Sequence, residues 1–166
     1  MLSEKSFLRS PAIIALVLGL ALTGCASKNR LPDNASQLGL NGATAGSQQD
    51  FTVNVGDRVF FLTDSTSLTQ QARAILDRQA QWLVRYTNHP ITIEGHADER
   101  GTREYNLALG ARRAAATRDY LTARGVPRNR IRTISYGKER PVAVCNDISC
   151  WSQNRRAVTL LAAPTG

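Results

Sequence analysis

The stretch ITIEGHADERGTREYNLALGARRAAATRDYLTARGV, residues 91–126, combines a short alternating segment, a glycine-bounded loop and a long helical pattern. Its first five residues alternate apolar and polar side chains, which is typical of a strand with one buried face. A helical period then covers residues 102–124 and ends at Gly125. The loop between strand and helix carries Asp98. A strand that leads into a long helix is a building unit of α/β folds.

Strands and helices continue to alternate on both sides of this unit. Residues 51–61, FTVNVGDRVFF, are rich in β-branched and aromatic side chains, which favours extended structure. Thr69 can cap a helix whose apolar positions follow the 3.6-residue period. Residues 131–137 and 156–162 are typical of two further strands.

The resulting order β-α-β-α-β-β predicts an α/β fold class. We expect an α+β two-layer sandwich with the helices on one face of a mixed sheet. A length of 166 residues with 42% hydrophobic content suits one domain with tails. Around Cys145 and Cys150 the sequence has neither a helical nor a strand period, so we expect a loop there.

The N-terminus is typical of a secretory signal. Lys5 and Arg9 precede an apolar run from Ala12 to Leu22, whose eleven residues are too few to cross a bilayer as a helix. The run ends in LTGC, which resembles the bacterial lipobox. The resemblance implies cleavage before Cys25 and attachment of lipid to its thiol.

The segment after this cysteine has the composition of a tether. It is rich in Ala, Gly, Ser, Asn and Gln and has no aromatic residue, so it cannot bury enough apolar surface to offset the entropy of ordering. We therefore predict a signal peptide over residues 1–24, a lipidated flexible segment over 25–50, and a folded domain over 51–166.

The formal net charge of +8 favours acidic partners in general, such as nucleic acid, anionic lipid or a carboxylate-rich polymer. Nucleic acid is the least expected of these partners. The basic residues are spread along the chain, Trp82 and Trp151 have the pattern of core aromatics, and the export signal points away from nucleic acid.

The cysteine count fits an exported, lipidated protein. Of three cysteines, Cys25 is assigned to the lipid, which leaves Cys145 and Cys150 to pair as a disulfide outside the cytoplasm. A zinc site is not expected, because no second Cys or His pair accompanies them.

One face of the 102–124 helix has an unusual arginine. Spacings of three or four residues place five side chains on that face: Asn106, Leu109, Arg113, Thr117 and Tyr120. Leu109 marks the face as covered, whereas Arg112 is turned about 100° away from Arg113. An arginine on a half-covered face needs an anionic partner, and Asp98 is a candidate.

The spacing leaves two interpretations of Asp98 and Arg113 open. They can form a structural ion pair in the free protein. They can also clamp an amino-acid head group, with the carboxylate holding its ammonium and the guanidinium its carboxylate. Gly95 and Gly101 allow close approach to a ligand, and the helix N-terminus near Thr102 adds backbone N–H groups that favour an anion.

Catalysis is the other use for these charges. His96, Asp98 and Glu99 could form a metal or acid–base cluster, but consecutive residues at a strand end point in different directions. The sequence has no nucleophile-elbow pattern. We expect no catalytic residue, no metal site and no cofactor.

Residues 91–126 resemble the core motif of the OmpA-like C-terminal domain family. GHADERGT and YNLALGARRA are similar to the peptidoglycan-associated lipoproteins within that family, and ISYGKERP and NRRAV extend the similarity over about residues 51–162. The resemblance implies binding of peptidoglycan through meso-diaminopimelate of the stem peptide. The family's loop aspartate and the second arginine of its helical pair match Asp98 and Arg113.

Further candidate site residues lie around this clamp: Phe61, Asp64, Gly101, Thr102 and Asn106. Leu62 stands where the family commonly has an aspartate, which affects the pocket rim rather than the clamp. The resemblance also implies a domain in the periplasm, an anchor in the outer membrane, and a Tol-system β-propeller protein as partner in envelope integrity and cell division. A nonspecific structural tether without a ligand pocket is the alternative.

Lipidation gives the first testable prediction. Cys25→Ser should leave a soluble or uncleaved product, because the variant lacks the thiol that carries the lipid. Membrane fractionation of cells that express wild type or variant checks this. Recovery of Cys25→Ser with the outer membrane would contradict the anchor.

Overall fold

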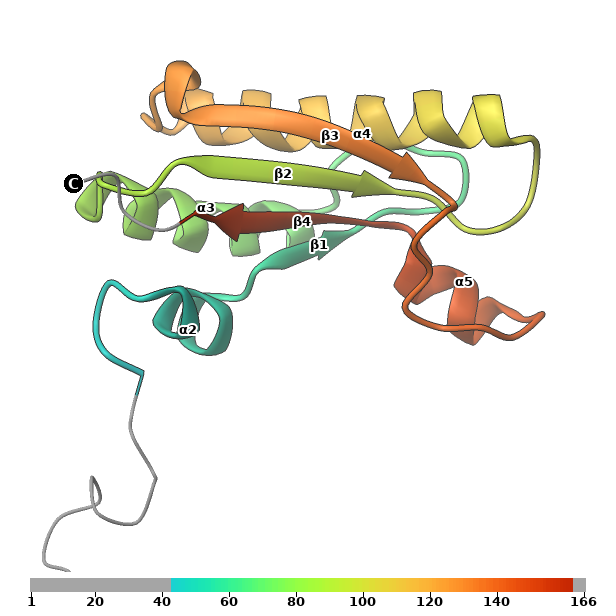
Figure 1. Cartoon of the computed structure of the whole chain (residues 1–166), viewed down its shortest axis with the longest axis horizontal. Coiled ribbons are helices and arrows are strands. Elements are labelled where there is room, and N and C mark those ends of the chain that lie inside the picture. The colour runs from blue at the N-terminus through green and yellow to red at the C-terminus, as the bar shows by residue number, and fades with distance from the viewer. Residues whose placement is uncertain (1–42, 163–166) are drawn as a thin grey trace, which may run out of the picture. The chain divides into compact units, whose positions relative to one another are not determined.

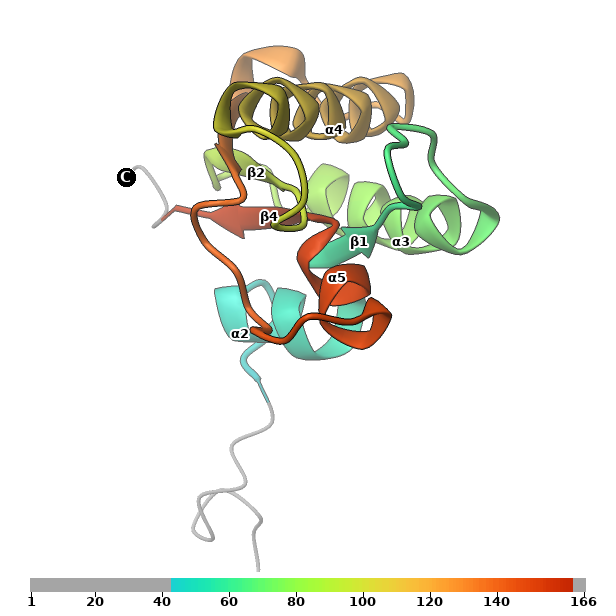
Figure 2. The same ribbon diagram turned by 90° about the vertical axis from the view of Figure 1, so that its right-hand side faces the viewer.

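The computed structural model describes residues 43–162, and Figures 1 and 2 show the arrangement of their elements. Four strands form one mixed sheet in the order β1-β4-β2-β3: β1 (Arg58–Phe60), β2 (Ile91–His96), β3 (Ile131–Gly137) and β4 (Arg156–Leu161). β2 and β3 are parallel, whereas β4 is antiparallel to both β1 and β2. This confirms the predicted two-layer fold with a mixed sheet. The signal peptide and Cys25 lie outside the described residues.

Two long helices, α3 (Gln70–Arg85) and α4 (Arg103–Ala123), cover one face of the sheet (Figure 2). The described residues also form four shorter elements: α2 (Gln48–Asp50), η3 (Phe51–Val55), η4 (Arg128–Arg130) and α5 (Ile148–Asn154). Within residues 43–162 none of the helices has the length and apolar character needed to cross a bilayer.

The helix predicted after Thr69 forms as expected. The Thr69 hydroxyl caps α3 by accepting the Ala72 N–H at 3.1 Å. The one polar residue on its buried face, Gln79, donates to the carbonyl of Gly56 at 2.7 Å and accepts from the Thr159 hydroxyl at 2.9 Å. A glutamine in the core is therefore satisfied, and it ties α3 to β4.

The start of the domain differs from the prediction. Residues 51–55 form the helical turn η3 rather than a strand, and only β1 is extended. Phe51 is fully buried against Trp82, with ring centroids 5.0 Å apart. Burying that ring against α3 outweighs the local preference of its neighbours for extended structure.

Residues just before this turn also contact the domain, although their composition suggested a tether. The Gly46 carbonyl lies 3.0 Å from the His89 ring, and the Trp82 indole N–H donates to Asp50 at 2.9 Å. These partners come from elsewhere in the chain, so local composition does not reveal them.

The cysteine segment contains a helix that was not predicted. The Asp147 side chain caps α5 by accepting the Ser149 N–H at 2.7 Å. The predicted disulfide is confirmed and joins Cys145, which precedes the helix, to Cys150 within it. A helix of seven residues is too short to show a clear period, and its cap and disulfide supply the stability that length does not.

α4 lies unusually close to the sheet because two glycines face each other. A Cβ atom added at Gly110 of α4 would be 2.8 Å from the carbonyl oxygen of Gly95 in β2, closer than such contacts normally come. The helix backbone can therefore approach the strand directly. One turn further along α4, Arg113 consequently reaches the end of β2.

This close approach gives a stability prediction. Glycine to alanine inside a helix normally stabilises it by about 0.8–1 kcal/mol. Gly110→Ala should instead destabilise the domain by about 1–3 kcal/mol, because the added methyl group forces α4 away from β2. Urea unfolding measures the difference. A gain in stability would show that α4 can move away from β2 without weakening the packing, which contradicts this prediction.

The exposed neighbour Ala111 is the control for this measurement. Ala111→Gly should lose only the helix propensity of alanine, about 1 kcal/mol.

Candidate functional site

Three segments meet at one end of the sheet and line a pocket of about 250 Å³. They are the loop after β1, the loop after β2 and the first half of α4. The pocket is lined by Thr63, Asp64, Asp98, Arg100, Gly101, Tyr105, Asn106, Leu109 and Arg113. The structure thus brings five of the predicted site residues together. Phe61 and Thr102 are not among the lining residues.

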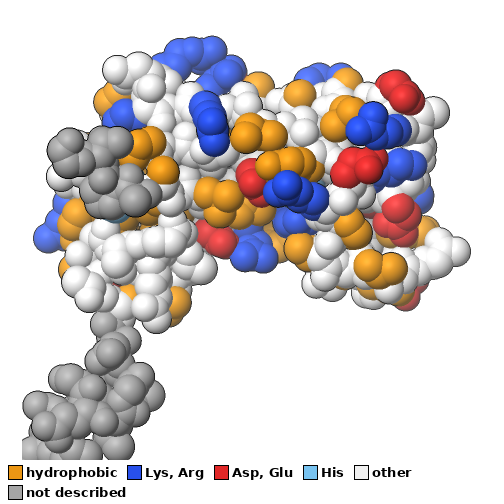
Figure 3. Space-filling model, in the orientation of Figure 1, with side chains coloured by type: hydrophobic (Ala, Val, Ile, Leu, Met, Phe, Trp, Pro, Cys, Tyr) orange, Lys and Arg blue, Asp and Glu red, His pale blue; other side chains and the backbone are white. Residues whose placement is uncertain are grey.

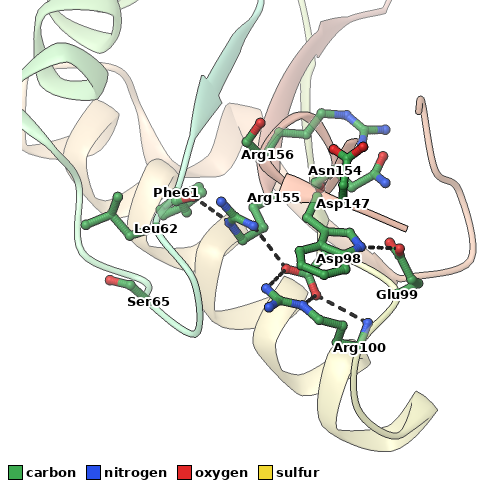
Figure 4. Close-up of polar contacts among 12 residues, drawn as sticks. Phe61, Leu62, Ser65, Asp98, Glu99, Arg100, Asp147, Asn154, Arg155 and Arg156 are labelled. Atoms are coloured by element: carbon green, nitrogen blue, oxygen red, sulfur yellow. Dashed lines mark hydrogen bonds and ion pairs between the residues drawn. The ribbon is translucent and has the colours of Figure 1, made fainter. Parts of the chain in front are cut away.

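Asp98 is buried at the start of the loop after β2, with 8% of its surface exposed. Its oxygen Oδ1 accepts from the backbone N–H of Arg100 at 3.3 Å and from Nε of Arg100 at 3.2 Å. Its oxygen Oδ2 accepts from Nη2 of Arg100 at 2.8 Å and from Nη1 of Arg155 at 3.2 Å (Figure 4). The carboxylate is therefore held between two guanidinium groups.

Burial alone would raise the pKa of the Asp98 carboxyl. The hydrogen bonds from Arg100 and Arg155 outweigh burial, so the pKa lies below its usual value of 3.8. Asp98 is consequently an anion at neutral pH.

The loop that carries Asp98 is fixed by its neighbours. The Asn106 side chain donates to the Arg100 carbonyl at 2.8 Å. The Lys138 ammonium donates to the carbonyls of Glu99 at 3.1 Å and Gly101 at 2.6 Å. Gly101 has a φ of +89°, a backbone conformation that favours glycine. The predicted residues Gly101 and Asn106 thus shape the pocket through the backbone.

Arg113 is fully buried, and its hydrogen bonds go to backbone carbonyls. Its Nε donates to Ser65 at 2.9 Å, its Nη1 to His96 at 2.8 Å and its Nη2 to Leu62 at 3.1 Å. Its guanidinium carbon lies 5.2 Å from the centre of the Phe61 ring. Phe61 therefore supports Arg113 from behind instead of lining the pocket.

The interpretation of Asp98 and Arg113 as a structural ion pair in the free protein is wrong. Among the described residues Arg113 forms no ion pair, and Asp98 pairs with Arg100 and Arg155. The carbonyls that satisfy Arg113 belong to segments far away in sequence, so its partners could not be read from helical spacing. Burial, followed by repulsion from Arg155, lowers the pKa of Arg113 to about 10, and it stays cationic at neutral pH.

Leu62 contacts the site only through its backbone. Its side chain is 64% exposed, whereas its carbonyl holds Arg113. The absence of an aspartate side chain at this position therefore leaves the support of Arg113 intact. Arg112 is exposed on α4 whereas Arg113 is buried, as the turn of about 100° between them predicted.

The pocket rim is bridged by Tyr105 and Asp64. The Tyr105 hydroxyl on α4 donates to the Asp64 carboxylate on the loop after β1. Asp64 has a φ of +51°, which is uncommon for a residue with a side chain. Sparsely populated backbone conformations persist where surrounding contacts enforce them, often at functional sites.

Three residues at the site were not predicted. Arg155 lies within the NRRAV motif and is 5% exposed; its Nε also donates to the Phe61 carbonyl at 3.1 Å. Arg100 and Trp151 are the other two, and the guanidinium carbon of Arg100 lies 4.1 Å from the centre of the Trp151 ring. The expectation that Trp151 is a core aromatic is wrong. It is half-buried beside the loop, and its indole N–H donates to Glu99.

The residues considered for catalysis do not converge. The His96 ring stacks on Tyr136 with centroids 5.7 Å apart, and Glu99 accepts from Trp151. Burial, with repulsion from Arg156 and Arg140, lowers the pKa of His96 to about 4, so it is neutral at pH 7. Within the described part of the chain no three His, Cys, Asp or Glu side chains are placed to hold a metal ion.

The face of the sheet that α3 and α4 leave uncovered carries charges of both signs. On the face shown in Figure 3, Lys and Arg side chains alternate with acidic and apolar ones. This face therefore lacks the continuous basic stripe typical of nucleic-acid binding.

Comparison with known proteins gives consistent results. The sequence matches the OmpA family over residues 60–155. A peptidoglycan-associated lipoprotein of Rhizobium meliloti (strain 1021) is 74% identical over 159 residues, which cover 95% of this chain and 90% of the relative. One from Pseudomonas aeruginosa is 40% identical over 156 residues, which cover 87% and 92%.

Solved structures show the same fold. The peptidoglycan-associated lipoprotein from Burkholderia pseudomallei superposes with a TM-score of 0.66 at 40% identity, covering 70% of this chain and 100% of that one. The C-terminal domain of Helicobacter pylori MotB superposes with a TM-score of 0.60 at 22% identity, covering 64% and 84%, and shows likeness of fold alone.

The buried ion pair between Asp98 and Arg155 predicts that the stability of the domain depends on pH. Asp98→Asn should destabilise the domain by about 3 kcal/mol at pH 7, because the buried Arg155 guanidinium loses its counter-ion. The folded-state pKa of Asp98 is depressed, so its contribution is complete above its unfolded pKa near 4 and is lost as the pH falls through the folded value. Urea unfolding of both proteins should show the gap closing in acid. A gap that stays constant from neutral to strongly acidic pH would contradict this account.

Proposed function

The chain belongs to the OmpA family and, within it, to the peptidoglycan-associated lipoproteins, and from this premise we propose that it binds peptidoglycan without a covalent bond. The protein is an outer-membrane lipoprotein, anchored by lipid on Cys25, with its folded domain in the periplasm. It links the outer membrane to the cell wall and works with the Tol-system β-propeller protein in envelope integrity and cell division.

The ligand that fits the pocket best is the free amino-acid centre of meso-diaminopimelate in the stem peptide. The observation that carries this proposal is one pocket of about 250 Å³ with a buried carboxylate, Asp98, and a buried guanidinium, Arg113, on its walls. An amino-acid centre carries an ammonium and a carboxylate on one carbon, which complements this pair of charges.

Arg113 is held ready for such a ligand. Three of the five N–H groups of its guanidinium donate to carbonyls within residues 43–162, which leaves two for a carboxylate. Because the guanidinium is already fixed, binding loses little side-chain entropy. Arg113 has no exposed surface, so the ligand carboxylate must enter deeply, past the Tyr105–Asp64 bridge.

A nonspecific structural tether is the second candidate. Its support is the positive net charge, +8 for the full sequence, because a basic chain attracts any carboxylate-rich polymer. Such attraction falls steeply with salt and does not depend on the third residue of the stem peptide. The two candidates are therefore separable by ligand chemistry.

Calorimetry with two stem tripeptides tests the clamp. Peptide with meso-diaminopimelate should bind at least about tenfold more tightly than peptide with lysine, a difference of about 1.4 kcal/mol, because lysine lacks the carboxylate that Arg113 holds. Arg113→Ala should lose at least about tenfold in affinity, whereas Arg112→Ala serves as the matched control and should change little. Folding of each variant is checked by thermal unfolding. Equal affinity of the folded wild type for both peptides would favour the nonspecific tether.

A further inference from the structure

The hydrogen bonds on Asp98 have a consequence for ligand entry. A carboxylate offers about four acceptor positions, two on each oxygen. In the free domain all four are occupied, three by Arg100 and one by Arg155. An incoming ammonium can reach Asp98 with good geometry only if one of these donors leaves.

The two arginines differ in how easily they can leave. The Arg155 side chain is only 7% exposed, and its second hydrogen bond holds the Phe61 carbonyl. Moving it would leave a buried charge without a partner, which is strongly unfavourable. The Arg100 side chain is 41% exposed, and its guanidinium turns back to the Asp98 carboxylate (Figure 4).

We propose that Arg155 is the permanent counter-ion of Asp98 and that Arg100 is an exchangeable one, which the ammonium of the ligand displaces. This inference rests on the proposed function, because it describes how the ligand reaches that same site. Arg100 thereby occupies the carboxylate in the free domain and lowers the affinity of any ligand whose ammonium must displace it.

The surroundings of Arg100 let its side chain move while its backbone stays. Its carbonyl is held by Asn106 at 2.8 Å, and the neighbouring carbonyls of the loop are held by Lys138. Its guanidinium already lies over the Trp151 ring, 4.1 Å from the ring centre. That aromatic face remains available to a cation that has left Asp98.

The exchange predicts that an amine without a carboxylate is a poor ligand. A guanidinium binds a carboxylate through two parallel hydrogen bonds, whereas an ammonium is a point charge. Replacing Arg100 by an ammonium therefore gains little by itself. A ligand that also places a carboxylate on Arg113 obtains the additional interaction that makes the exchange favourable.

Arg100→Gln tests the exchange with the same two stem tripeptides. If Arg100 competes with the ligand, its removal should strengthen binding of the meso-diaminopimelate peptide about three- to fivefold, in line with the strength of a half-exposed ion pair. The lysine peptide should gain by the same factor, because the work of displacing Arg100 belongs to the domain and not to the ligand. Arg100→Lys keeps the charge but loses the paired geometry, so it should gain less than Arg100→Gln.

Arg103→Gln is the matched control. Arg103 is an exposed arginine three residues further on, and it pairs with Glu139 at 3.2 Å. Within the described residues it forms neither a hydrogen bond nor an ion pair with Asp98. The substitution Arg103→Gln removes one positive charge near the site, so its effect on affinity measures the general electrostatic contribution. The gain in peptide affinity caused by Arg100→Gln should exceed the change in affinity caused by Arg103→Gln.

The outcomes separate the two proposals. Weaker or unchanged binding of the meso-diaminopimelate peptide by folded Arg100→Gln would overturn the exchange and make Arg100 a direct ligand contact or a bystander. A gain equal to that of Arg103→Gln would also overturn it. If the wild type itself does not prefer the meso-diaminopimelate peptide, the proposed function fails instead.

Discussion

The Arg113 guanidinium is buried in the domain and donates to the carbonyls of Leu62, Ser65 and His96. These three carbonyls belong to the loop after β1 and to the end of β2, so one side chain from α4 joins both segments. A buried cation needs such partners, because an unsatisfied one would be strongly destabilising. The same hydrogen bonds therefore fix the shape of the pocket wall and satisfy the buried charge.

Close contact between α4 and the sheet makes this arrangement possible. Gly95 and Gly110 remove the side chains that would separate helix and strand, so the arginine one turn later reaches the carbonyl of His96. The disulfide-linked α5 completes the other side of the site. It ends beside Arg155 and presents Trp151 to the loop that carries Asp98. Packing and the shape of the pocket thus depend on the same few contacts.

The charges around the pocket also suit a zwitterion. Asp98 is neutralised by arginines before any ligand is present, and Arg113 is stabilised by carbonyl dipoles rather than by a full negative charge. A ligand with one ammonium and one carboxylate adds no net charge to a buried site. Desolvation is least unfavourable when each buried charge meets its opposite.

The sequence by itself determined the order of elements, the caps and ends of the long helices, and the helix face that carries Arg113, because these depend on local periodicity and on side-chain contacts three or four residues apart. It also indicated Asp98 and Arg113 as members of one site. Only the tertiary structure decided which partners they have. The carbonyls on Arg113 and the guanidinium groups on Asp98 come together through the fold, and Phe51 turns helical because α3 covers it. Every residue has a backbone carbonyl, so the sequence does not show which carbonyls will accept from a buried arginine. It shows only that such an arginine needs hydrogen-bond partners.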